Sequence, residues 1–455
     1  MMDRSQVIDA CGRYWNPTAA TFFHVTHRTI ESHAEGCTVV DEEGRRYLDF
    51  ACSYGVFVIG HCNPYVRRRV LEQMDRLASA PFGVANPVAA ELMEVVTDML
   101  PGGLNRVFFA NSGAESSEMA LRAALACNAP RRKVIAAINS YHGKTLGALN
   151  ILGQQGHRSP FLPLMAEVEF VPYGDIEAMR RAVGDGVAAV FLEPILGGPF
   201  ITVPPPGYLK EVESLCRRTQ SLLVVDEVQT GFGRAGKMFA IEYDGVEPDI
   251  MLLSKGITGG HAAIALAVMQ DSVVERLERI EGLPPRYLSS DSGGSPYACA
   301  AALASIEFIR DNQLPERAAF LGQRLRSGLE RMARKYPKLI LDVPGTGLMT
   351  GLRVRNPAVE TAITMALGKR GVHVGHSMNE TAPHPVLRFY PPLTVTEAEI
   401  DQSLEALEQA LEGLGRIPGR VYDLLDVIVR RQYRIPRKWL LRLSGVKDGH
   451  AQAHA

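Results

Sequence analysis

The chain has 455 residues, of which 46% are hydrophobic and 22% charged, and its formal net charge is −1. This composition is typical of a folded globular protein with more than one domain, and it excludes a disordered or fibrous chain. Because the net charge is close to zero, nothing attracts the whole molecule to nucleic acid or to acidic membranes, and binding must come from local sites.

The cysteines and the N-terminal sequence bear on the cellular compartment. The seven cysteines are scattered and have neither CxxC nor zinc-ligand spacing, so we expect reduced thiols and no metal site. The stretch MMDRSQVIDACGRYW lacks the apolar core of a signal peptide, and no run of about 18 apolar residues occurs anywhere. These features predict a cytoplasmic enzyme.

The first predicted elements are two short strands around a turn in residues 36–50 and an amphipathic helix in residues 63–78. Seven runs rich in apolar and β-branched residues follow, beginning at residues 106, 133, 167, 187, 222, 250 and 263. Most of these runs are continuously apolar, which is typical of strands buried on both faces of a mainly parallel sheet.

Helices are expected between the runs, for example in residues 112–127, 175–184 and 206–220. The alternation of strands and helices predicts a large α/β domain. Beyond it, a long helical region is expected over about 297–335, with strands in 339–354 and 386–393.

The two ends of the chain together could form a second, smaller domain. Residues 1–75 are expected to contribute to the small domain, and residues 76–320 to form a large cofactor-binding domain. Residues 321–415 would complete the small domain, and residues 416–455 form a tail. The tail is a basic amphipathic appendage, since residues 416–448 contain nine Arg or Lys against three Asp.

Polar side chains follow five of the seven runs, at the positions where ligands bind in an open parallel sheet. These segments are residues 111–115, 139–143, 193–194, 226–229 and 255–256. A Ser-Gly pair at a helix start is most often a simple cap, and Tyr141 and His142 taken singly are most often packing residues. Asp226 and Lys255 are harder to explain in this way, because an ionised side chain after an apolar strand needs a partner or a task.

Together the five segments match the requirements of one cofactor, pyridoxal phosphate. This cofactor needs a lysine for its Schiff base, an acid for its pyridine nitrogen, an aromatic surface for its ring and a helix N-terminus for its phosphate. In this interpretation Lys255 forms the Schiff base and then acts as a general base. Asp226 pairs with the ring nitrogen, and Tyr141 stacks on the ring.

The phosphate and the remaining ring substituents have candidate partners as well. Ser112 and the backbone N–H groups of Gly113 and Ala114 would hold the phosphate. Gln229 is expected to form a hydrogen bond with the phenolate oxygen of the ring, and His142 and Glu193 complete the predicted cofactor site.

The chain resembles the class III pyridoxal-phosphate-dependent aminotransferases and is most similar to their putrescine, ornithine and acetylornithine branch. The resemblance runs from about residue 39 to about residue 411. It rests on the ordered motifs FFANSGAESSEMAL, YHGKTLGAL, FLEPI, VVDEVQTGFGR, PDIMLLSKGITGG and LRFYPPLTVTEAEID. It implies the fold type I architecture, a homodimer with active sites at the interface, and ping-pong amino transfer between a primary amine or ω-amino compound and a 2-oxo acid.

The resemblance also assigns the second substrate. Arg388, in LRFYPP, stands where the family binds the carboxylate of 2-oxoglutarate or glutamate, a group that a guanidinium matches bidentately. Gly198 replaces a glutamate that in relatives can pair with this arginine when a substrate lacks an α-carboxylate. With Phe200, which adds apolar bulk near the entrance, this change favours a larger or more apolar amine or aldehyde over putrescine itself.

The stretch YLSSDSGGSP, residues 287–296, is a second departure from the family pattern. Its Ser295 and Pro296 predict the start of a helix. Asp291 stands where relatives have a threonine that binds the phosphate of the neighbouring subunit's cofactor. At roughly 4 Å and an effective dielectric near 20, two like unit charges cost on the order of 4 kcal/mol, so Asp291 would weaken cofactor binding unless it is protonated or turned away. Ser290 or another serine of the loop, Ser289 or Ser292, could then supply the hydroxyl.

Other functions and partners stay open. Aminomutases and decarboxylases use the same fold and sites, and a cofactor-binding protein with reduced turnover is a further alternative, against which the intact Lys255, Asp226, Tyr141 and Gln229 argue. A solvated charged face explains the tail as well as docking does. Docking would engage a membrane surface or an acidic partner, such as an acyl carrier protein delivering an aldehyde, through Trp439, Leu440, Leu441 and Leu443.

Overall fold

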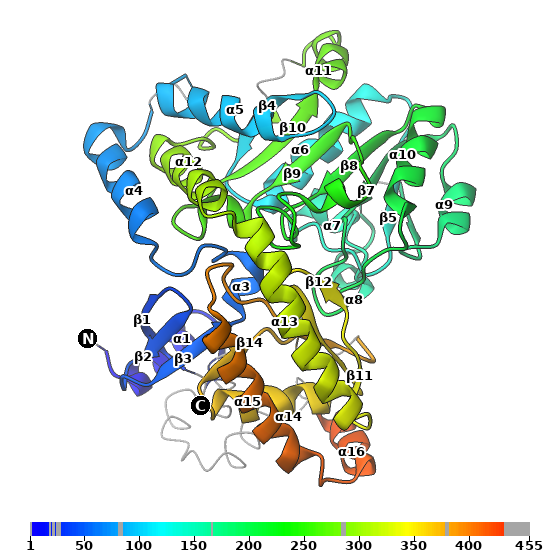
Figure 1. Cartoon of the computed structure of the whole chain (residues 1–455). Coiled ribbons are helices and arrows are strands. Elements are labelled where there is room, and N and C mark those ends of the chain that lie inside the picture. Colours follow the sequence, from blue (N-terminus) through cyan, green and yellow to red (C-terminus); the bar gives the residue numbers. More distant parts are fainter. Residues whose placement is uncertain are drawn as a thin grey trace, which may run out of the picture.

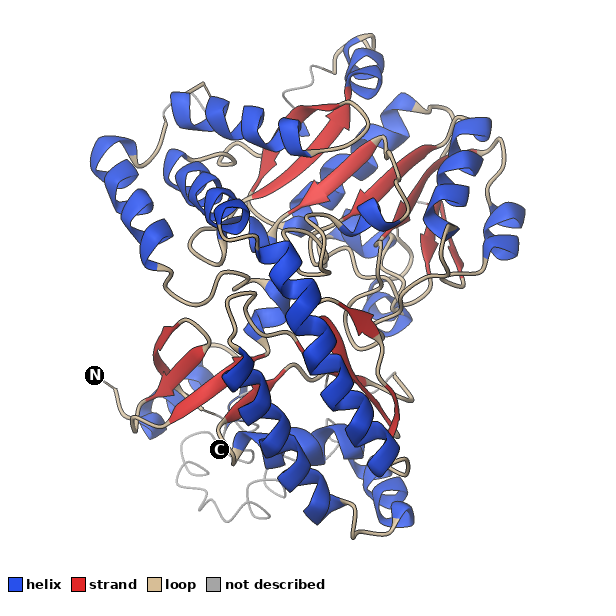
Figure 2. Cartoon of the chain, viewed as in Figure 1, coloured by secondary structure: helices blue, strands red, loops and turns tan. Residues whose placement is uncertain are grey.

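The computed structural model describes residues 2–17, 20, 23, 29–80, 85–164, 167–283, 288–377 and 382–431. A sheet covered by helices forms the upper part of the molecule in Figure 1, and smaller sheets with long helices form the lower part. Figure 2 shows the helices on both faces of the large sheet. Among the described residues, no helix has both the length and the apolar character needed to cross a membrane.

The large sheet of the described chain contains seven strands in the order β4-β10-β9-β8-β7-β5-β6. Their bounds are β4 (Leu104–Ala110), β5 (Lys133–Ala137), β6 (Glu167–Val171), β7 (Val187–Leu192), β8 (Leu222–Asp226), β9 (Ile250–Leu253) and β10 (Ala265–Gln270). The seven predicted runs are thus confirmed as strands. Every residue of β7 and β8 is buried, which explains why these runs are continuously apolar. Only β10 is antiparallel to its neighbours, β4 and β9, so the other strands share one direction.

The helices predicted between the strands are confirmed. The helices of the upper part are α4 (Pro64–Leu77), α5 (Pro87–Met99), α6 (Gly113–Cys127), α7 (Leu146–Asn150), α8 (Gln155–Arg158), α9 (Ile176–Ala182), α10 (Tyr208–Thr219), α11 (Asp271–Glu278) and α12 (Pro296–Asp311), with the short 3₁₀ helices η1 (Ser159–Phe161), η2 (Ala240–Tyr243) and η3 (Lys255–Thr258). As predicted, Ser295 precedes α12 and Pro296 is its first residue.

The prediction of one long helical region over about 297–335 is wrong in one respect. The region contains two helices. The second is α13 (Leu314–Lys335), which runs from the upper into the lower part of the molecule in Figure 1. Gln313, between α12 and α13, has a φ of 48°, a left-handed conformation that an α-helix cannot continue through.

Two small sheets form the lower part. One joins both ends of the chain, with β1 (Glu31–Glu35), β2 (Thr38–Asp41) and β3 (Arg46–Phe50) next to β14 (Val372–Val374). The other contains β11 (Ile340–Asp342), β12 (Gly345–Thr346), β13 (Met349–Val354) and β15 (Val386–Phe389). The associated helices are α1 (Arg4–Tyr14), α3 (Cys52–Gly55), α14 (Pro357–Gly368), α15 (Glu397–Leu414) and α16 (Gly419–Arg430). The division of the chain at residues 75, 320 and 415 stays a prediction.

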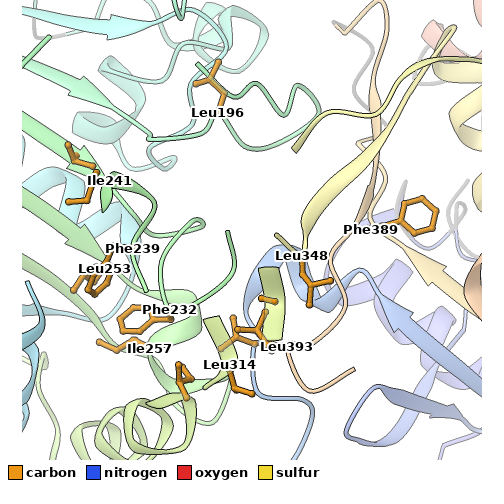
Figure 3. Packing of buried hydrophobic residues seen from close by; sticks show 14 of the residues in the cluster. Leu196, Phe232, Phe239, Ile241, Leu253, Ile257, Leu314, Leu348, Phe389 and Leu393 are labelled. Carbon is orange, nitrogen blue, oxygen red and sulfur yellow. The ribbon is translucent and has the colours of Figure 1, made fainter. Parts of the chain in front are cut away.

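The apolar core is continuous between the two parts. Figure 3 shows buried side chains that extend from the large sheet toward α13 and β15, namely Leu253, Phe239, Phe232, Ile257, Leu314, Leu393, Leu348 and Phe389, all of one cluster. The rings of Phe232 and Phe239 meet edge to face, with centroids 5.7 Å apart. Because this core is close-packed, the strand that carries Arg388 is held in a fixed position relative to the large sheet.

Candidate active site

The predicted site residues that follow strands of the large sheet lie at one edge of this sheet. Strands β4, β5, β7, β8 and β9 run in the same direction, so the segments that follow them meet at their carboxyl ends. Lys255 opens η3 directly after β9, Asp226 ends the neighbouring β8, and Glu193 follows β7. The sheet therefore brings an amine and two carboxyl groups from adjacent strands to one place.

Asp226 is held in a network of hydrogen bonds. Its Oδ2 lies 2.8 Å from Nδ1 of His142, and its Oδ1 accepts a hydrogen bond of 3.0 Å from the backbone N–H of Val228. Burial disfavours a charged His142 ring, but the hydrogen bond and the charge of Asp226 outweigh burial and raise the pKa of His142. A carboxylate has about four lone-pair sites, so Asp226 can accept another N–H group besides these two.

Lys255 has an unusual backbone and an unusual environment. Its φ is 45°, in the left-handed region that non-glycine residues rarely adopt and that is common at functional sites. Burial lowers the pKa of its amine, although the negative charges of Asp226 and Glu193 act in the opposite direction, and Arg388 lowers it further. A lowered pKa increases the fraction of neutral amine, which is the nucleophilic form.

Glu193 positions the segment that follows β5. Its Oε1 accepts a hydrogen bond of 2.9 Å from the backbone N–H of Tyr141, and its Oε2 accepts one of 3.1 Å from Gly197. Burial raises the pKa of Glu193 to about 7, an effect that His142 partly opposes. The Tyr141 side chain remains 38% exposed at the sheet edge, so its ring can still contact a ligand.

The N-terminus of α6 is the candidate anion site. Ser112 is its N-cap, and the Ser112 Oγ accepts a hydrogen bond of 3.3 Å from the backbone N–H of Glu115. Gly113 and Ala114 are the first helical residues, whose N–H groups have no acceptor within the helix. Such N–H groups bind phosphate readily.

In the residues predicted to bind the cofactor, two buried polar atoms have no hydrogen-bond partner within the described part of the chain. They are Oε1 of Gln229 and Nε2 of His142. The Nε2 of Gln229 donates to the carbonyl oxygen of Tyr54 over 3.1 Å. Because buried polar groups are nearly always hydrogen-bonded, unpartnered atoms in the segments that follow β5 and β8 fit a polar group that the chain does not supply. Pyridoxal phosphate, with its polar planar ring, meets this requirement.

Arg388 lies on β15 and is almost completely buried. Its Cζ is 4.5 Å from the centroid of the Tyr54 ring, and its Nε has no hydrogen-bond partner among the described residues. Tyr54 belongs to α3, where Cys52, Ser53 and Tyr54 all have positive φ. Sequence reasoning missed Tyr54, whose contacts with Gln229 and Arg388 come from distant parts of the chain.

The loop that carries Gly198 lies beside β15. The backbone N–H of Val386 donates to the carbonyl oxygen of Pro199 over 2.8 Å, and Phe200 is half-buried in the same loop. This places the loop next to the strand of Arg388. No side chain at position 198 reaches toward the guanidinium, since the residue is glycine.

The loop before α12 is anchored to the end of β4. The amide nitrogen of Asn111 donates to Oγ of Ser290 over 3.0 Å and to Oγ of Ser292 over 2.9 Å. Ser290 also donates its backbone N–H to the carbonyl oxygen of Phe109 over 3.0 Å. Asp291, between the two anchored serines, is exposed. Ser295 makes no side-chain capping bond to α12.

The tail is only partly described. Residues 416–431 include α16, whereas Trp439, Leu440, Leu441 and Leu443 lie outside the described residues. Within the part of the chain that the structure describes, no group of His, Cys, Asp and Glu side chains has the arrangement of a metal site.

Comparisons with known proteins match most of the chain to one family. Residues 22–411 match the family model described as Aminotransferase class-III. The chain is 39% identical over 403 residues to the putrescine aminotransferase of Pectobacterium atrosepticum, an alignment that covers 87% of this chain and 84% of that protein.

Solved structures are similar over most of their length. The ornithine aminotransferase from Toxoplasma gondii, with pyridoxal phosphate at partial occupancy in its active site, has a TM-score of 0.82 and 29% identity, covering 91% of this chain and 96% of that one. An (S)-enantioselective ω-transaminase from Thermomicrobium roseum has a TM-score of 0.82 and 28% identity, covering 91% and 99%. The chain therefore belongs to the class III aminotransferases and is a pyridoxal-phosphate-dependent transaminase of fold type I.

Proposed function

We propose that the protein transfers an amino group between a primary amine or ω-amino compound and a 2-oxo acid, with 2-oxoglutarate and glutamate as the acid pair. The observation that carries the proposal is the grouping of Lys255, Asp226 and Arg388, since the charges of the other two both act on Lys255. An amine, an acid and a guanidinium are the groups that this reaction requires.

Each of these side chains has a separate proposed task. Pyridoxal phosphate, when bound, supplies an electron sink next to the transferred nitrogen. Lys255 holds the cofactor covalently and, once released, its Nζ takes up and returns a proton as general base. Asp226, held by His142, keeps a proton on the ring nitrogen. Arg388 binds the carboxylate of the 2-oxo acid.

The remaining residues are proposed to position the cofactor. Tyr141, whose backbone is held by Glu193, stacks on the ring. Gln229 lies next to the oxygen substituent of the ring, where its free Oε1 can accept a hydrogen bond when that oxygen carries a proton, since Nε2 already donates to Tyr54. The N-terminus of α6 at Ser112, Gly113 and Ala114 holds the phosphate.

The chemistry of the amine is proposed from residues 196–202. A glycine at position 198 and the half-buried Phe200 favour an amine or aldehyde that is larger or more apolar than putrescine. The named relatives act on putrescine and on ornithine, or are described as ω-transaminases, so diamines and bulkier amines are the classes to compare.

Half-reactions test this proposal directly. Holoenzyme is mixed with glutamate, putrescine or 1-phenylethylamine, and the absorbance change from the aldehyde to the amine form of the cofactor is followed. Glutamate and 1-phenylethylamine should convert the cofactor, the latter faster than putrescine. Failure of glutamate would overturn the acid assignment, and failure of both amines would overturn the amine assignment.

Two variants sharpen the test. Arg388→Gln should raise the KM for glutamate and leave the KM for 1-phenylethylamine nearly unchanged. Arg334→Gln, at an exposed position of α13, is the matched control.

Release of carbon dioxide from glutamate would favour the decarboxylase alternative, and movement of the amino group within one molecule would favour an aminomutase. Cofactor binding without conversion of any substrate would favour a protein with reduced turnover.

We also propose a cytoplasmic homodimer with active sites at its interface. The support is family membership and the exposed Asp291, beside serines anchored at the N-terminal end of α6. Light scattering of the holoenzyme measures the assembly. A monomer with full activity would contradict the interface site.

We further propose that α16 and the basic segment after it dock an acidic carrier protein that delivers the carbonyl substrate. Leu424 and Ile428 of α16 are 69% and 51% exposed. Residues 416–448 carry nine Arg or Lys against three Asp, which complements an acidic surface. Leu424→Asp should lower activity on a carrier-bound aldehyde and not on the free aldehyde. Equal activity on both would contradict docking at this helix.

A further inference from the structure

Arg388 is a buried cation in need of a counter-charge. The residue is 4% exposed, and its Nε has no hydrogen-bond partner among the described residues. Tyr54 covers its guanidinium with a neutral ring. The loop beside β15 has a glycine at position 198, which carries no carboxylate. Burial of an uncompensated charge is costly, so a carboxylate elsewhere is expected to offset it.

Glu360 of α14 is a carboxylate with a fixed orientation. The residue is 1% exposed. Its Oε1 accepts hydrogen bonds from the backbone N–H and the Oγ of Ser377, at 2.7 and 3.0 Å, and its Oε2 accepts one of 2.8 Å from the same Oγ. The N–H group and the hydroxyl of Ser377, whose single proton is shared between the two carboxylate oxygens, prevent the carboxylate from turning away.

The segment that holds Glu360 also contacts Arg388. Gly375, two residues before Ser377, exchanges two backbone hydrogen bonds with Arg388, of 2.7 and 2.9 Å. A Cβ atom at Gly375 would lie 3.3 Å from Nε of Arg388, so a side chain at this position would crowd the guanidinium. Gly375, Glu360 and Tyr54 line one cavity of about 1160 Å³.

The two charges act on each other. Burial raises the pKa of Glu360, while its bonds to Ser377 and the positive charge of Arg388 lower it. Within the described residues, the two side chains form no direct ion pair. They are connected through Ser377, which binds Glu360, and Gly375, which binds the backbone of Arg388.

We propose that Glu360 is the counter-charge of Arg388 and a specificity-determining residue, which weakens the hold of this arginine on a substrate carboxylate. The inference rests on the proposed role of Arg388 in binding the 2-oxo acid. Because Ser377 fixes Glu360, the position of this carboxyl group does not depend on which substrate is bound. The site can then accept an amine without a carboxylate even though position 198 is glycine.

The test compares two Michaelis constants in the complete reaction, with 1-phenylethylamine as amino donor and 2-oxoglutarate as acceptor. Glu360→Gln should lower the KM for 2-oxoglutarate about fivefold and raise the KM for 1-phenylethylamine, with kcat nearly unchanged, because the arginine loses its compensation. Glu360→Asp, which keeps the charge, should restore most of the wild-type ratio. Glu412→Gln, at an exposed glutamate of α15, is the matched control. An unchanged KM ratio in Glu360→Gln would overturn the inference.

A second set of variants separates this inference from the proposed function. If Arg388→Gln leaves the KM for 2-oxoglutarate unchanged, the role of the arginine itself fails. If Arg388→Gln raises that KM but Glu360→Gln does not change the ratio, only the role of Glu360 fails. In the double variant the effect of Glu360→Gln should disappear, because the two side chains act as one unit.

Stability is measured alongside, because Glu360 is buried. If Glu360→Gln does not fold, Ser377→Ala replaces it, since loss of the Oγ removes one of the two donors that hold the carboxylate. Ser377→Ala should change the KM ratio in the same direction by a smaller factor. A ratio of the KM values for 2-oxoglutarate and 1-phenylethylamine in Ser377→Ala equal to that of the wild-type protein would overturn the inference.

Discussion

The Nδ1 atom of His142 lies 2.8 Å from Oδ2 of Asp226, and both side chains are buried at the carboxyl edge of the large sheet. The residues are 84 positions apart in the chain. Their pairing means that the acid proposed for the cofactor's ring nitrogen is oriented by an imidazole. A hydrogen bond to a charged group contributes more than a neutral one, so this pair should matter for catalysis.

Replacement of His142 by alanine should lower kcat about 10- to 100-fold, because a hydrogen bond to a charged group contributes about 1.5–3 kcal/mol. The rate of cofactor conversion by glutamate measures this effect. His33→Ala, at an exposed position of β1, is the control. Unchanged kcat in His142→Ala would show that Asp226 keeps its orientation without the imidazole.

Replacement of Lys255 by alanine should lower turnover by at least about 10³-fold, because both the covalent link and the general base are lost. The variant should still bind pyridoxal phosphate through the other contacts, as an equilibrium dialysis measurement would show. Normal turnover in Lys255→Ala would refute the assignment of this lysine.

Replacement of Asp291 by threonine should slow the loss of cofactor on dialysis about two- to fivefold. The factor is small because the side chain is exposed and water screens its charge. Asp291→Asn removes the charge without adding a hydroxyl, so it should reproduce the effect if repulsion is the cause. No change in either variant would mean that Asp291 does not face a phosphate.

The buried Glu227 should make stability depend on pH. Burial raises the pKa of its carboxyl group to about 8, from an ordinary value of 4.5. The folded protein therefore holds this proton more tightly than the unfolded chain does. The stability contributed by the protonated group is complete below pH 4.5 and is lost as the pH rises to about 8.

Glu227→Gln removes this ionisation. Between pH 5 and pH 9 the wild-type protein should lose about 4 kcal/mol more stability than the variant. Urea unfolding of both proteins at the two pH values measures the difference. Parallel losses in the two proteins would contradict the raised pKa of Glu227.

The strands of the large sheet could be predicted because their burial leaves a local mark in the sequence. Strands such as β7 and β8 are buried on both faces, so each position must be apolar. In contrast, β1 was not predicted, since ESHAE is largely exposed and has no apolar pattern. This strand exists because its backbone pairs with β2, a contact that requires no particular side chains.

The candidate site was predictable to a similar extent. Asp226 and Lys255 were conspicuous because charged residues rarely end apolar strands. Arg388 was identified through family resemblance, and neither Tyr54 nor Glu360 was found. Nothing near these two in the sequence marks them.

The sequence by itself determined the order of strands and helices, the residues at the strand ends and the family, because apolar runs and motifs are local properties. Only the tertiary structure decided which side chains meet. The hydroxyl of Tyr54 donates to the carbonyl oxygen of His376, 322 positions away, and its ring covers Arg388. Such contacts depend on the packing of the whole core, in which distant segments are fixed within hydrogen-bond distance, and no local pattern of residues encodes them.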